Sequence, residues 1–246
     1  MRRFLIPSSA VSADTVTLSG DLFHHIVHVL RLHRGTRLCL ADEKGREYEG
    51  RIRRVDADSL TVSVEGSHMT SPLETGPRIT LFQGLPKGDK LDFVIQKCTE
   101  LGVSRVVPFI GERSVARPPE RRIQDKLERW RRIAMEAARQ SNRLTAPTID
   151  FANDLSEICR SSDHDVKILL WEEEKTLSLK TFLAGAGRPG SVAVIIGPEG
   201  GLSVDEVSMA YRCGFNSVSI GKRILRTETA GMALLAILQF HWGDIG

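Results

Sequence analysis

Two segments near the C-terminus combine glycine turns with charged side chains, a pattern typical of ligand-binding loops. They are VAVIIGPEGGLS at 192–203 and IGKRILRTETA at 220–230. Each begins with a β-branched apolar run, turns at glycine and opens a segment predicted to be helical. Gly197, Gly200, Gly201 and Gly221 let the main chain approach a flat ligand where a Cβ atom would collide. Because ligands of an open α/β sheet bind at the carboxyl ends of its strands, we expect the two segments to form one shared site.

The common nucleotide-binding motifs do not explain these segments. The sequence has no G-x-x-x-x-G-K-[ST] motif, and GPEGG lacks the G-x-G-x-x-G spacing of a dinucleotide fold. GPEGG taken by itself fits a structural turn equally well. Its pairing with ILRTETA favours a functional interpretation.

The elements that must position these loops alternate between strand and helix from residue 73 to residue 246. Such alternation predicts a mostly parallel sheet with helices on both faces. Predicted strands lie at 79–83, 106–110, 148–151, 166–171, 192–196 and 217–220. Predicted helices lie at 89–101, 120–139, 154–160, 178–184, 203–213 and 228–241.

Residues 1–72 are predicted to form a separate small β-barrel domain. Alternating or β-branched patterns predict strands at 15–18, 37–41, 48–55 and 59–64, with a hairpin turn at Glu43-Lys44-Gly45. Leu22, Ile26, Val29 and Leu30 recur at helical spacing and predict one helix. The Gly, Ser, Thr and Pro content of 65–77 predicts a linker.

Composition and charge narrow the class of protein. The hydrophobic fraction is 41% and the charged fraction 26%, as in ordinary globular proteins. Residues 71–145 carry 15 Lys/Arg against 9 Asp/Glu, whereas 146–246 carry 9 against 13. A basic middle suits a polyanionic partner, although the run at 120–132 by itself fits a solvated helix face. We expect a cytoplasmic protein, because no signal peptide or membrane span is evident and the four cysteines form no pair motif.

A metal site is not expected. His24 and His28 have the i, i+4 spacing that a metal site uses, but no third ligand accompanies them. Surface or RNA-facing histidines are the favoured interpretation.

GPEGGLS followed by IGKRILRTETA resembles the paired signature of the SPOUT superfamily, specifically the RsmE-type 16S ribosomal RNA uridine N3-methyltransferase family. The resemblance is colinear through the chain. It includes MRRFLIP at the start, HVLRLHRG at 28–35, KGDKLDFVIQKCTELGV at 87–103 and EAARQSNR at 136–143. It implies a C-terminal domain tied in a trefoil knot, a PUA-like RNA-binding β-barrel, and S-adenosylmethionine as cofactor.

The resemblance implies that three loops hold the cofactor. The implied residues are Leu170, Trp171, Gly197, Pro198, Glu199, Gly200, Gly201, Leu202, Ile220, Gly221, Ile224, Leu225, Arg226, Thr227 and Ala230. The aliphatic members also fit ordinary core packing. Glu199 fits either a ribose hydroxyl or the cap of the following helix.

The implied reaction is attack of a uracil nitrogen on a sulfonium methyl group. Loss of the imide proton leaves negative charge on the carbonyl oxygens, and Arg226 is our first choice to stabilise that charge. Glu228 is the nearest carboxylate in sequence; it fits either a base or a helix N-terminal residue.

The expected partners are 16S ribosomal RNA, within the small ribosomal subunit, and a second copy of the chain. Arginines suit phosphate contacts and base stacking, and the candidates are Arg2 or Arg3, Arg31, Arg34, Arg113, Arg139 and Arg143. The final helix, AGMALLAILQFHW, is apolar on nearly all sides, and the relatives are homodimers, so we expect a twofold dimer. Two alternatives stay open: a SPOUT enzyme acting on a ribose 2′-hydroxyl, and a non-catalytic RNA-binding protein.

Overall fold

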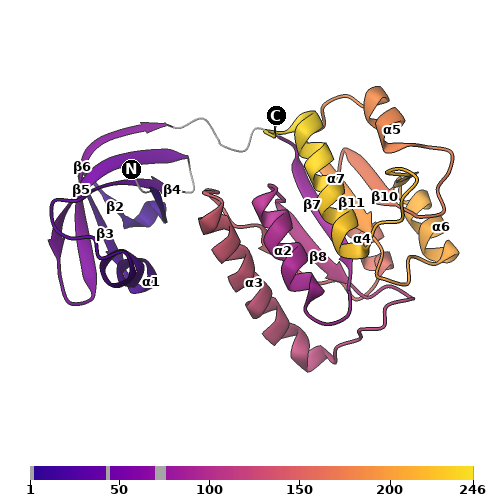
Figure 1. Cartoon of the computed structure of the whole chain (residues 1–246), viewed down its shortest axis with the longest axis horizontal. Coiled ribbons are helices and arrows are strands. Elements are labelled where there is room, and N and C mark those ends of the chain that lie inside the picture. The colour runs from indigo at the N-terminus through magenta and orange to yellow at the C-terminus, as the bar shows by residue number, and fades with distance from the viewer. Residues whose placement is uncertain (1–2, 43–44, 70–75, 246) are drawn as a thin grey trace. The chain divides into compact units, whose positions relative to one another are not determined.

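The structure is a computed structural model that describes residues 3–42, 45–69 and 76–245 (Figure 1). The chain divides into two compact units, Met1–Leu73 and Glu74–Gly246. Each unit has its own hydrophobic core.

The N-terminal unit is a curled six-stranded sheet with the order β1-β4-β5-β6-β3-β2. Its strands are β1 (Arg3–Ile6), β2 (Val11–Ser12), β3 (Thr15–Ser19), β4 (Arg37–Asp42), β5 (Arg46–Val55) and β6 (Ser59–Met69). The pairs are antiparallel except β1 with β4. A 3-10 turn, η1 (Ser8–Ala10), and a helix, α1 (Gly20–His24) continuing as the π-helical turn η2 (His25–Val29), complete the unit.

The sequence predicted four of these strands and the helix, and it was wrong about the linker. Strand β6 continues to Met69, because its residues 66–69 pair with Arg46–Glu49 of β5 despite their polar composition. The short strands β1 and β2 were not predicted. Residues 43 and 44 of the predicted hairpin turn, and 70–75 of the predicted linker, lie outside the described residues.

The C-terminal unit is built on a parallel six-stranded sheet with the order β12-β10-β11-β7-β8-β9. Its strands are β7 (Arg78–Gly84), β8 (Arg105–Phe109), β9 (Thr148–Ile149), β10 (Val166–Leu170), β11 (Ser191–Ile196) and β12 (Asn216–Val218). Every recorded pair in this sheet is parallel. All six strands therefore end at the same edge.

Helices cover both faces of this sheet, which confirms the predicted α/β class (Figure 1). They are α2 (Lys90–Glu100), α3 (Ile123–Gln140) after the 3-10 turn η3 (Glu120–Arg122), α4 (Leu155–Ser161), α5 (Leu179–Gly185), α6 (Val204–Arg212) and α7 (Thr227–Trp242). One buried cluster joins α2, α3, α5 and α7 to the sheet. The other joins α4 and α6 to the opposite face.

The register of the central strands brings separate loops together. Ile196, the last residue of β11, pairs with Leu170 of β10 on one side and with Gln83 of β7 on the other. Val218, the last residue of β12, also pairs with Leu170. The loops that follow these strands consequently leave the sheet side by side.

Helix α7 is apolar around most of its circumference, but one chain does not bury all of it. Leu234, Leu235 and Leu238 are fully buried. Ile237 is 36% exposed and Phe240 is 72% exposed. An apolar face therefore remains open to solvent on the single chain.

Candidate active site

A cavity of about 550 Å³ lies at the carboxyl ends of β10, β11 and β12; we call it the strand-end cavity. Three loops line it, after β10, after β11, and from the end of β12 to the first turn of α7. The two glycine segments thus line one cavity, as the sequence predicts. All the predicted cofactor residues line it except Gly200 and Leu202.

Those two residues support the loop from outside the cavity. Leu202 is buried in the core beneath the loop. A Cβ atom at Gly200 would lie 3.0 Å from both Cβ and the carbonyl oxygen of Arg113. Glycine at position 200 therefore lets the loop pack against the loop after β8.

Close main-chain packing explains the glycines of the loop after β11. Gly201 has a φ of +69°, a left-handed conformation that favours glycine, and its amide donates to the Pro198 carbonyl at 3.0 Å. A Cβ atom at Gly197 would lie 3.2 Å from the carbonyl carbon of Gly201. A Cβ atom at Gly84, at the end of β7, would meet the backbone nitrogen of Pro198 and lie 2.7 Å from the carbonyl carbon of Gly197.

A buried hydrogen-bond chain ties this loop to α7. The amide of Gln83, which is fully buried at the end of β7, donates to Thr227 Oγ1 at 2.8 Å. The Thr227 hydroxyl in turn donates to the Gly197 carbonyl at 2.6 Å. The chain fixes the start of α7 against the glycine turn, because each buried polar group in it would be costly to leave unpaired.

The start of α6 excludes one of the two interpretations of Glu199, that it caps this helix. Ser203 caps α6 and forms a capping box with Glu206, at 3.2 Å and 2.8 Å, so the helix cap needs no contribution from Glu199. Glu199 accepts instead from the Lys87 amide at 3.1 Å and from Lys90 Nζ at 2.9 Å. The helix-cap interpretation of Glu199 was wrong.

Lys90 joins two carboxylates at the rim of the strand-end cavity. Its Nζ lies 2.9 Å from Glu199 Oε1 and 3.7 Å from Glu228 Oε2. The hydrogen bond to Glu199 raises the pKa of Lys90. Burial raises the pKa of Glu199, but the hydrogen bonds from Lys90 and from backbone amides outweigh burial, so the pKa of Glu199 is lowered. Among the described residues, Glu228 Oε2 has no hydrogen-bond partner although it is buried.

Several residues of the site were not predicted from the sequence. Lys90 is the first residue of α2 and lies more than 100 positions from the carboxylates it contacts. The sequence indicates Lys90 only through the KGDK run at 87–90, which is part of the stretch that resembles the family. Glu172, Lys222 and Arg223 also line the cavity. Arg226, which was predicted, is the N-cap residue of α7 and borders the cavity with an exposed side chain.

In the N-terminal unit, the predicted RNA-contacting arginines have different surroundings. Arg3 is paired with Glu47 at 2.6 Å, and its side chain is 18% exposed. Arg31 and Arg34 are exposed in the turn after η2, where Arg31 has a φ of +52°. Arg2 lies outside the described residues.

In the C-terminal unit, two of the three predicted arginines are exposed. Arg113 borders the glycine loop, with its Nη1 3.4 Å from the Gly200 carbonyl, and Arg139 lies 3.8 Å from Glu136. Arg143 is buried, and its Nη1 donates to the carbonyls of Thr99 at 2.9 Å and Val103 at 2.7 Å. The structure contradicts an RNA contact by Arg143, because its guanidinium is buried against the last turn of α2 and the turn that follows it.

The described residues contain no group of three side chains arranged to bind a metal ion. The rings of His24 and His28 lie 5.0 Å apart without a third ligand. No helix of the described part of the chain is long and apolar enough to cross a membrane.

Comparison with known proteins connects both units of the chain to one class of enzyme. The family model described as "RNA methyltransferase domain" matches residues 74–239, and the model described as "RNA methyltransferase PUA domain" matches 18–65. Ribosomal RNA small subunit methyltransferase E of Bacillus subtilis is 31% identical over 93% of this chain and 91% of its own length. The protein of the same name from Aquifex aeolicus is 34% identical over 79% of this chain and 82% of its own.

Two solved structures with bound S-adenosylmethionine have the same architecture. Ribosomal RNA small subunit methyltransferase E from Neisseria gonorrhoeae superposes with a TM-score of 0.85 at 31% identity over 100% of both chains. A putative methyltransferase from Legionella pneumophila gives a TM-score of 0.83 at 30% identity over 98% of both chains.

Proposed function

Because the chain belongs to the ribosomal RNA small subunit methyltransferase E family, we propose that it methylates N3 of a uridine in 16S ribosomal RNA, with S-adenosylmethionine as methyl donor. The observation that carries the proposal is the strand-end cavity, which both glycine segments line. Relatives that hold S-adenosylmethionine share this fold over the whole chain. The alternatives, methylation of a ribose hydroxyl and RNA binding without catalysis, have no observation that favours them.

The cavity fits an adenosine-containing cofactor. Leu170, Ile220 and Leu225 supply aliphatic walls, and the glycine turns expose main-chain groups. Gly221 has a φ of +136°, and a Cβ atom there would meet no protein atom within 4 Å. The main chain at Gly221 therefore has free space beside it, which a ligand can fill.

We assign the binding of S-adenosylmethionine to the residues that line the strand-end cavity. From the predicted set these are Leu170, Trp171, Gly197, Pro198, Glu199, Gly201, Ile220, Gly221, Ile224, Leu225, Arg226, Thr227 and Ala230. Gly200 and Leu202 act indirectly by shaping the loop.

Bound S-adenosylmethionine supplies an electrophilic methyl group on a sulfonium centre. N3 of uracil forms a bond to this methyl carbon as the bond to sulfur breaks, and the N3 proton goes to a base. We assign the base to Glu228, whose Oε2 is buried without a hydrogen-bond partner among the described residues. Arg226, at the N-cap of α7, stabilises the negative charge that spreads onto the uracil carbonyl oxygens.

Lys90 has a positioning role in this proposal. It pairs with Glu199 at 2.9 Å and lies farther from Glu228, at 3.7 Å. Glu199 takes up its hydrogen bond, so Glu228 keeps one oxygen free to accept a proton.

Further parts of the proposal concern the whole chain. We assign residues 1–72 to a PUA-like RNA-binding barrel and 73–246 to a methyltransferase domain with the trefoil knot that the SPOUT resemblance implies. Arg3, Arg31, Arg34, Arg113 and Arg139 are proposed RNA contacts. The exposed apolar face of α7, with Ile237 and Phe240, supports a homodimer, and the ribosomal substrate supports a cytoplasmic location.

The proposal is tested by mass spectrometry of nucleosides after incubation with small-subunit RNA and labelled S-adenosylmethionine. We expect labelled 3-methyluridine. A 2′-O-methyl nucleoside would establish the ribose alternative, and the absence of labelled product from both naked RNA and intact subunits would establish the non-catalytic one.

The role of Arg226 is tested by the Arg226→Ala variant. We expect kcat to fall about 10² to 10³-fold, as when a preorganised charge-stabilising group is removed. The Kd for S-adenosylmethionine, measured by calorimetry, should stay within about threefold of wild type, because an exposed charge contributes little to ground-state binding. Equal losses in both quantities would contradict a role in charge stabilisation.

A further inference from the structure

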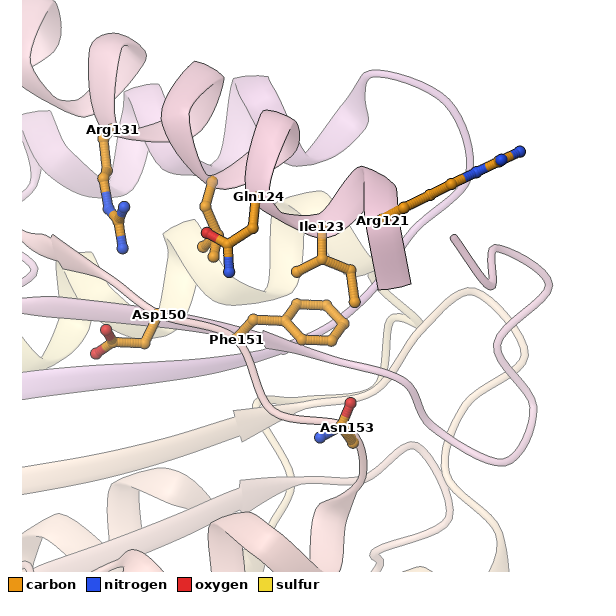
Figure 2. Close-up of a pocket in the computed structure, with 8 residues that line it drawn as sticks. Arg121, Ile123, Gln124, Arg131, Asp150, Phe151 and Asn153 are labelled. Atoms are coloured by element: carbon orange, nitrogen blue, oxygen red, sulfur yellow. The ribbon is translucent and has the colours of Figure 1, made fainter. Parts of the chain in front are cut away.

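A second pocket, of about 640 Å³, lies beside the carboxyl end of the edge strand β9; we call it the β9 pocket (Figure 2). Its lining comes from η3, the first half of α3 and the segment after β9. The residues are Arg121, Ile123, Gln124, Leu127, Arg131, Asp150, Phe151 and Asn153. Its volume lies within the range of small-ligand sites, and the reaction proposed above uses none of these residues.

The two walls of the β9 pocket combine an apolar surface with hydrogen-bonding groups. Figure 2 shows Ile123, Gln124 and Arg131 descending from α3 toward Asp150 and Phe151 on the opposite segment. The Phe151 ring lies beneath Ile123. This combination suits a planar base, because aromatic faces stack on bases of any sequence and amides hydrogen-bond to base edges.

Three polar side chains of the β9 pocket are held in place by other protein groups. Arg131 Nη2 donates to the Ile149 carbonyl at 3.2 Å, and the Asn153 amide donates to Glu157 at 3.3 Å. Asp150 pairs with Arg105 at 2.7 Å, so its carboxylate is compensated and repels an anion less. A fixed, compensated set of groups costs little ordering entropy when a ligand binds.

Two other polar side chains of the β9 pocket are free of such contacts within the described part of the chain. Among the described residues, Gln124 and Arg121 make no hydrogen bond or ion pair, and both are exposed. Figure 2 shows Arg121 extending away from the pocket at the start of α3. An exposed guanidinium at the rim of the pocket suits the phosphate that accompanies a base.

The β9 pocket lies at the same edge of the sheet as the strand-end cavity. Strand β9 is three positions from β11 in the order β11-β7-β8-β9, and all these pairs are parallel. At about 4.8 Å per strand, the two strand ends lie roughly 15 Å apart. The loop between β8 and η3 spans this interval and carries Arg113 and Arg117. Arg113 Nη1 lies 3.4 Å from the Gly200 carbonyl, so this basic loop reaches the glycine turn.

We propose that the β9 pocket binds an unpaired nucleotide of the RNA substrate, other than the one that is methylated, with its base against Phe151 and its phosphate near Arg121. The proposal rests on the proposed function for the presence of RNA at this edge. The loop that carries Arg113 and Arg117 provides a basic path for the backbone between the two sites.

The test compares two variants of helix α3 that carry the same chemical change. Gln124→Glu places a carboxylate in the β9 pocket, whereas Gln140→Glu makes the same change at an exposed position about 24 Å farther along the helix. We expect Gln124→Glu to raise the Kd and KM for small-subunit RNA about tenfold through like-charge repulsion. Gln140→Glu should stay within about twofold of wild type, as an isolated surface charge does.

Two further variants separate stacking from phosphate contact. Phe151→Leu keeps an apolar side chain, so the chain should fold, and we expect its RNA affinity to fall about fivefold because stacking is lost. Arg121→Ala should lower the slope of log Kd against log salt by about one, the signature of one lost phosphate contact. For all these variants, kcat and the Kd for S-adenosylmethionine should match wild type.

Equal RNA affinities of Gln124→Glu and Gln140→Glu would overturn the nucleotide pocket. If wild type methylates small-subunit RNA and these two variants behave alike, the pocket proposal fails and the proposed function stands. If wild type transfers no methyl group but Gln124→Glu still weakens RNA binding in an anisotropy assay, the proposed function fails and the pocket proposal stands.

Discussion

The strand-end cavity and the β9 pocket lie along one edge of the same sheet, but main-chain turns shape the first and side chains shape the second. The strand-end cavity is shaped by main-chain turns, in which a Cβ atom at Gly197 or Gly201 would crowd neighbouring atoms and Gly221 leaves open space for a ligand. The β9 pocket has no glycine among its lining residues and is shaped by side chains of α3 and of the segment after β9.

This difference predicts how each site tolerates amino-acid substitutions. A main-chain cavity has a fixed shape, and a side chain added where the chain is closely packed must displace its neighbours. A side-chain pocket on a helix surface can lose one group while the helix stays in place. We therefore expect substitutions near the strand-end cavity to affect folding and ligand binding together, and substitutions in the β9 pocket to affect binding alone.

Among changes to the packing of the two sites, the largest effect on the affinity for S-adenosylmethionine is expected for Gly84→Ala. The added methyl group would meet the backbone of Pro198 and Gly197, so the glycine turn must move away from β7. Overpacking of this kind costs about 1–3 kcal/mol, which corresponds to a loss of about fivefold to 150-fold in affinity for S-adenosylmethionine. Titration calorimetry measures the affinity directly.

Gly185→Ala is the matched control for this change. Gly185 ends α5, and a Cβ atom there would meet no atom within 4 Å. Its affinity should equal that of wild type. If Gly84→Ala also binds S-adenosylmethionine normally, the strand-end cavity is more adaptable than its packing indicates, and the contrast between the two sites is lost.

The importance of Gly84 was not readable from the sequence, although the glycine turn that it supports was. GPEGG is a local signal, since glycine, proline and the following helix stand next to one another. Gly84 and Gln83 lie more than 100 residues earlier and reach the turn only because β7 pairs with β11. Spacing along the chain predicts that strands exist, but the order of strands in the sheet is set by packing.

An intermediate effect, on the free energy of unfolding, is expected for Thr227→Val. This change keeps the shape of the side chain and removes its hydroxyl. The Gly197 carbonyl then loses its donor, and the Gln83 amide loses one of its two acceptors and keeps the Gly84 carbonyl. Leaving such buried groups unpaired costs about 1–3 kcal/mol in the free energy of unfolding, measured by denaturant titration. Thr227→Ser keeps the hydroxyl and should recover most of this stability.

A Thr227→Val chain as stable as wild type would show that the link between α7 and the glycine turn is incidental. In the β9 pocket, by contrast, Gln124 has no hydrogen-bond partner among the described residues to lose. Measuring the free energy of unfolding of both Thr227→Val and Gln124→Glu therefore tests whether only the strand-end cavity is coupled to the stability of the fold.

Arg143 and β6 show where sequence patterns mislead. Arg143 lies in a basic stretch and was predicted to contact RNA, but its guanidinium donates to two main-chain carbonyls, one in the last turn of α2 and one just after it. The end of β6 has a polar composition typical of a linker, yet it pairs with β5. In both places a long-range hydrogen bond decides the outcome, whereas the helices of the C-terminal unit follow local periodicity and were predicted within a few residues.

The smallest effect is expected for Lys90→Met, which tests whether side chains as well as main chain shape the strand-end cavity. Lys90 is partly exposed, so we expect its loss to change the affinity for S-adenosylmethionine by no more than about threefold at pH 7. The pKa of Glu199 should rise toward its ordinary value, because the hydrogen bond from Lys90 is what chiefly lowers it against the effect of burial.

The sign of the accompanying pH effect follows from that lowered pKa. In the wild type, ionised Glu199 contributes stability at neutral pH, and this contribution is lost as the pH falls through its folded pKa, below the ordinary value of 4.5. In Lys90→Met this contribution should be smaller, because the folded-state pKa of Glu199 lies closer to its ordinary value, and carbon NMR titration of the Glu199 carboxyl group measures the shift. A loss of cofactor affinity as large as that of Gly84→Ala would mean that charged side chains, and not the glycine turns alone, define the cavity, which would make the two sites alike.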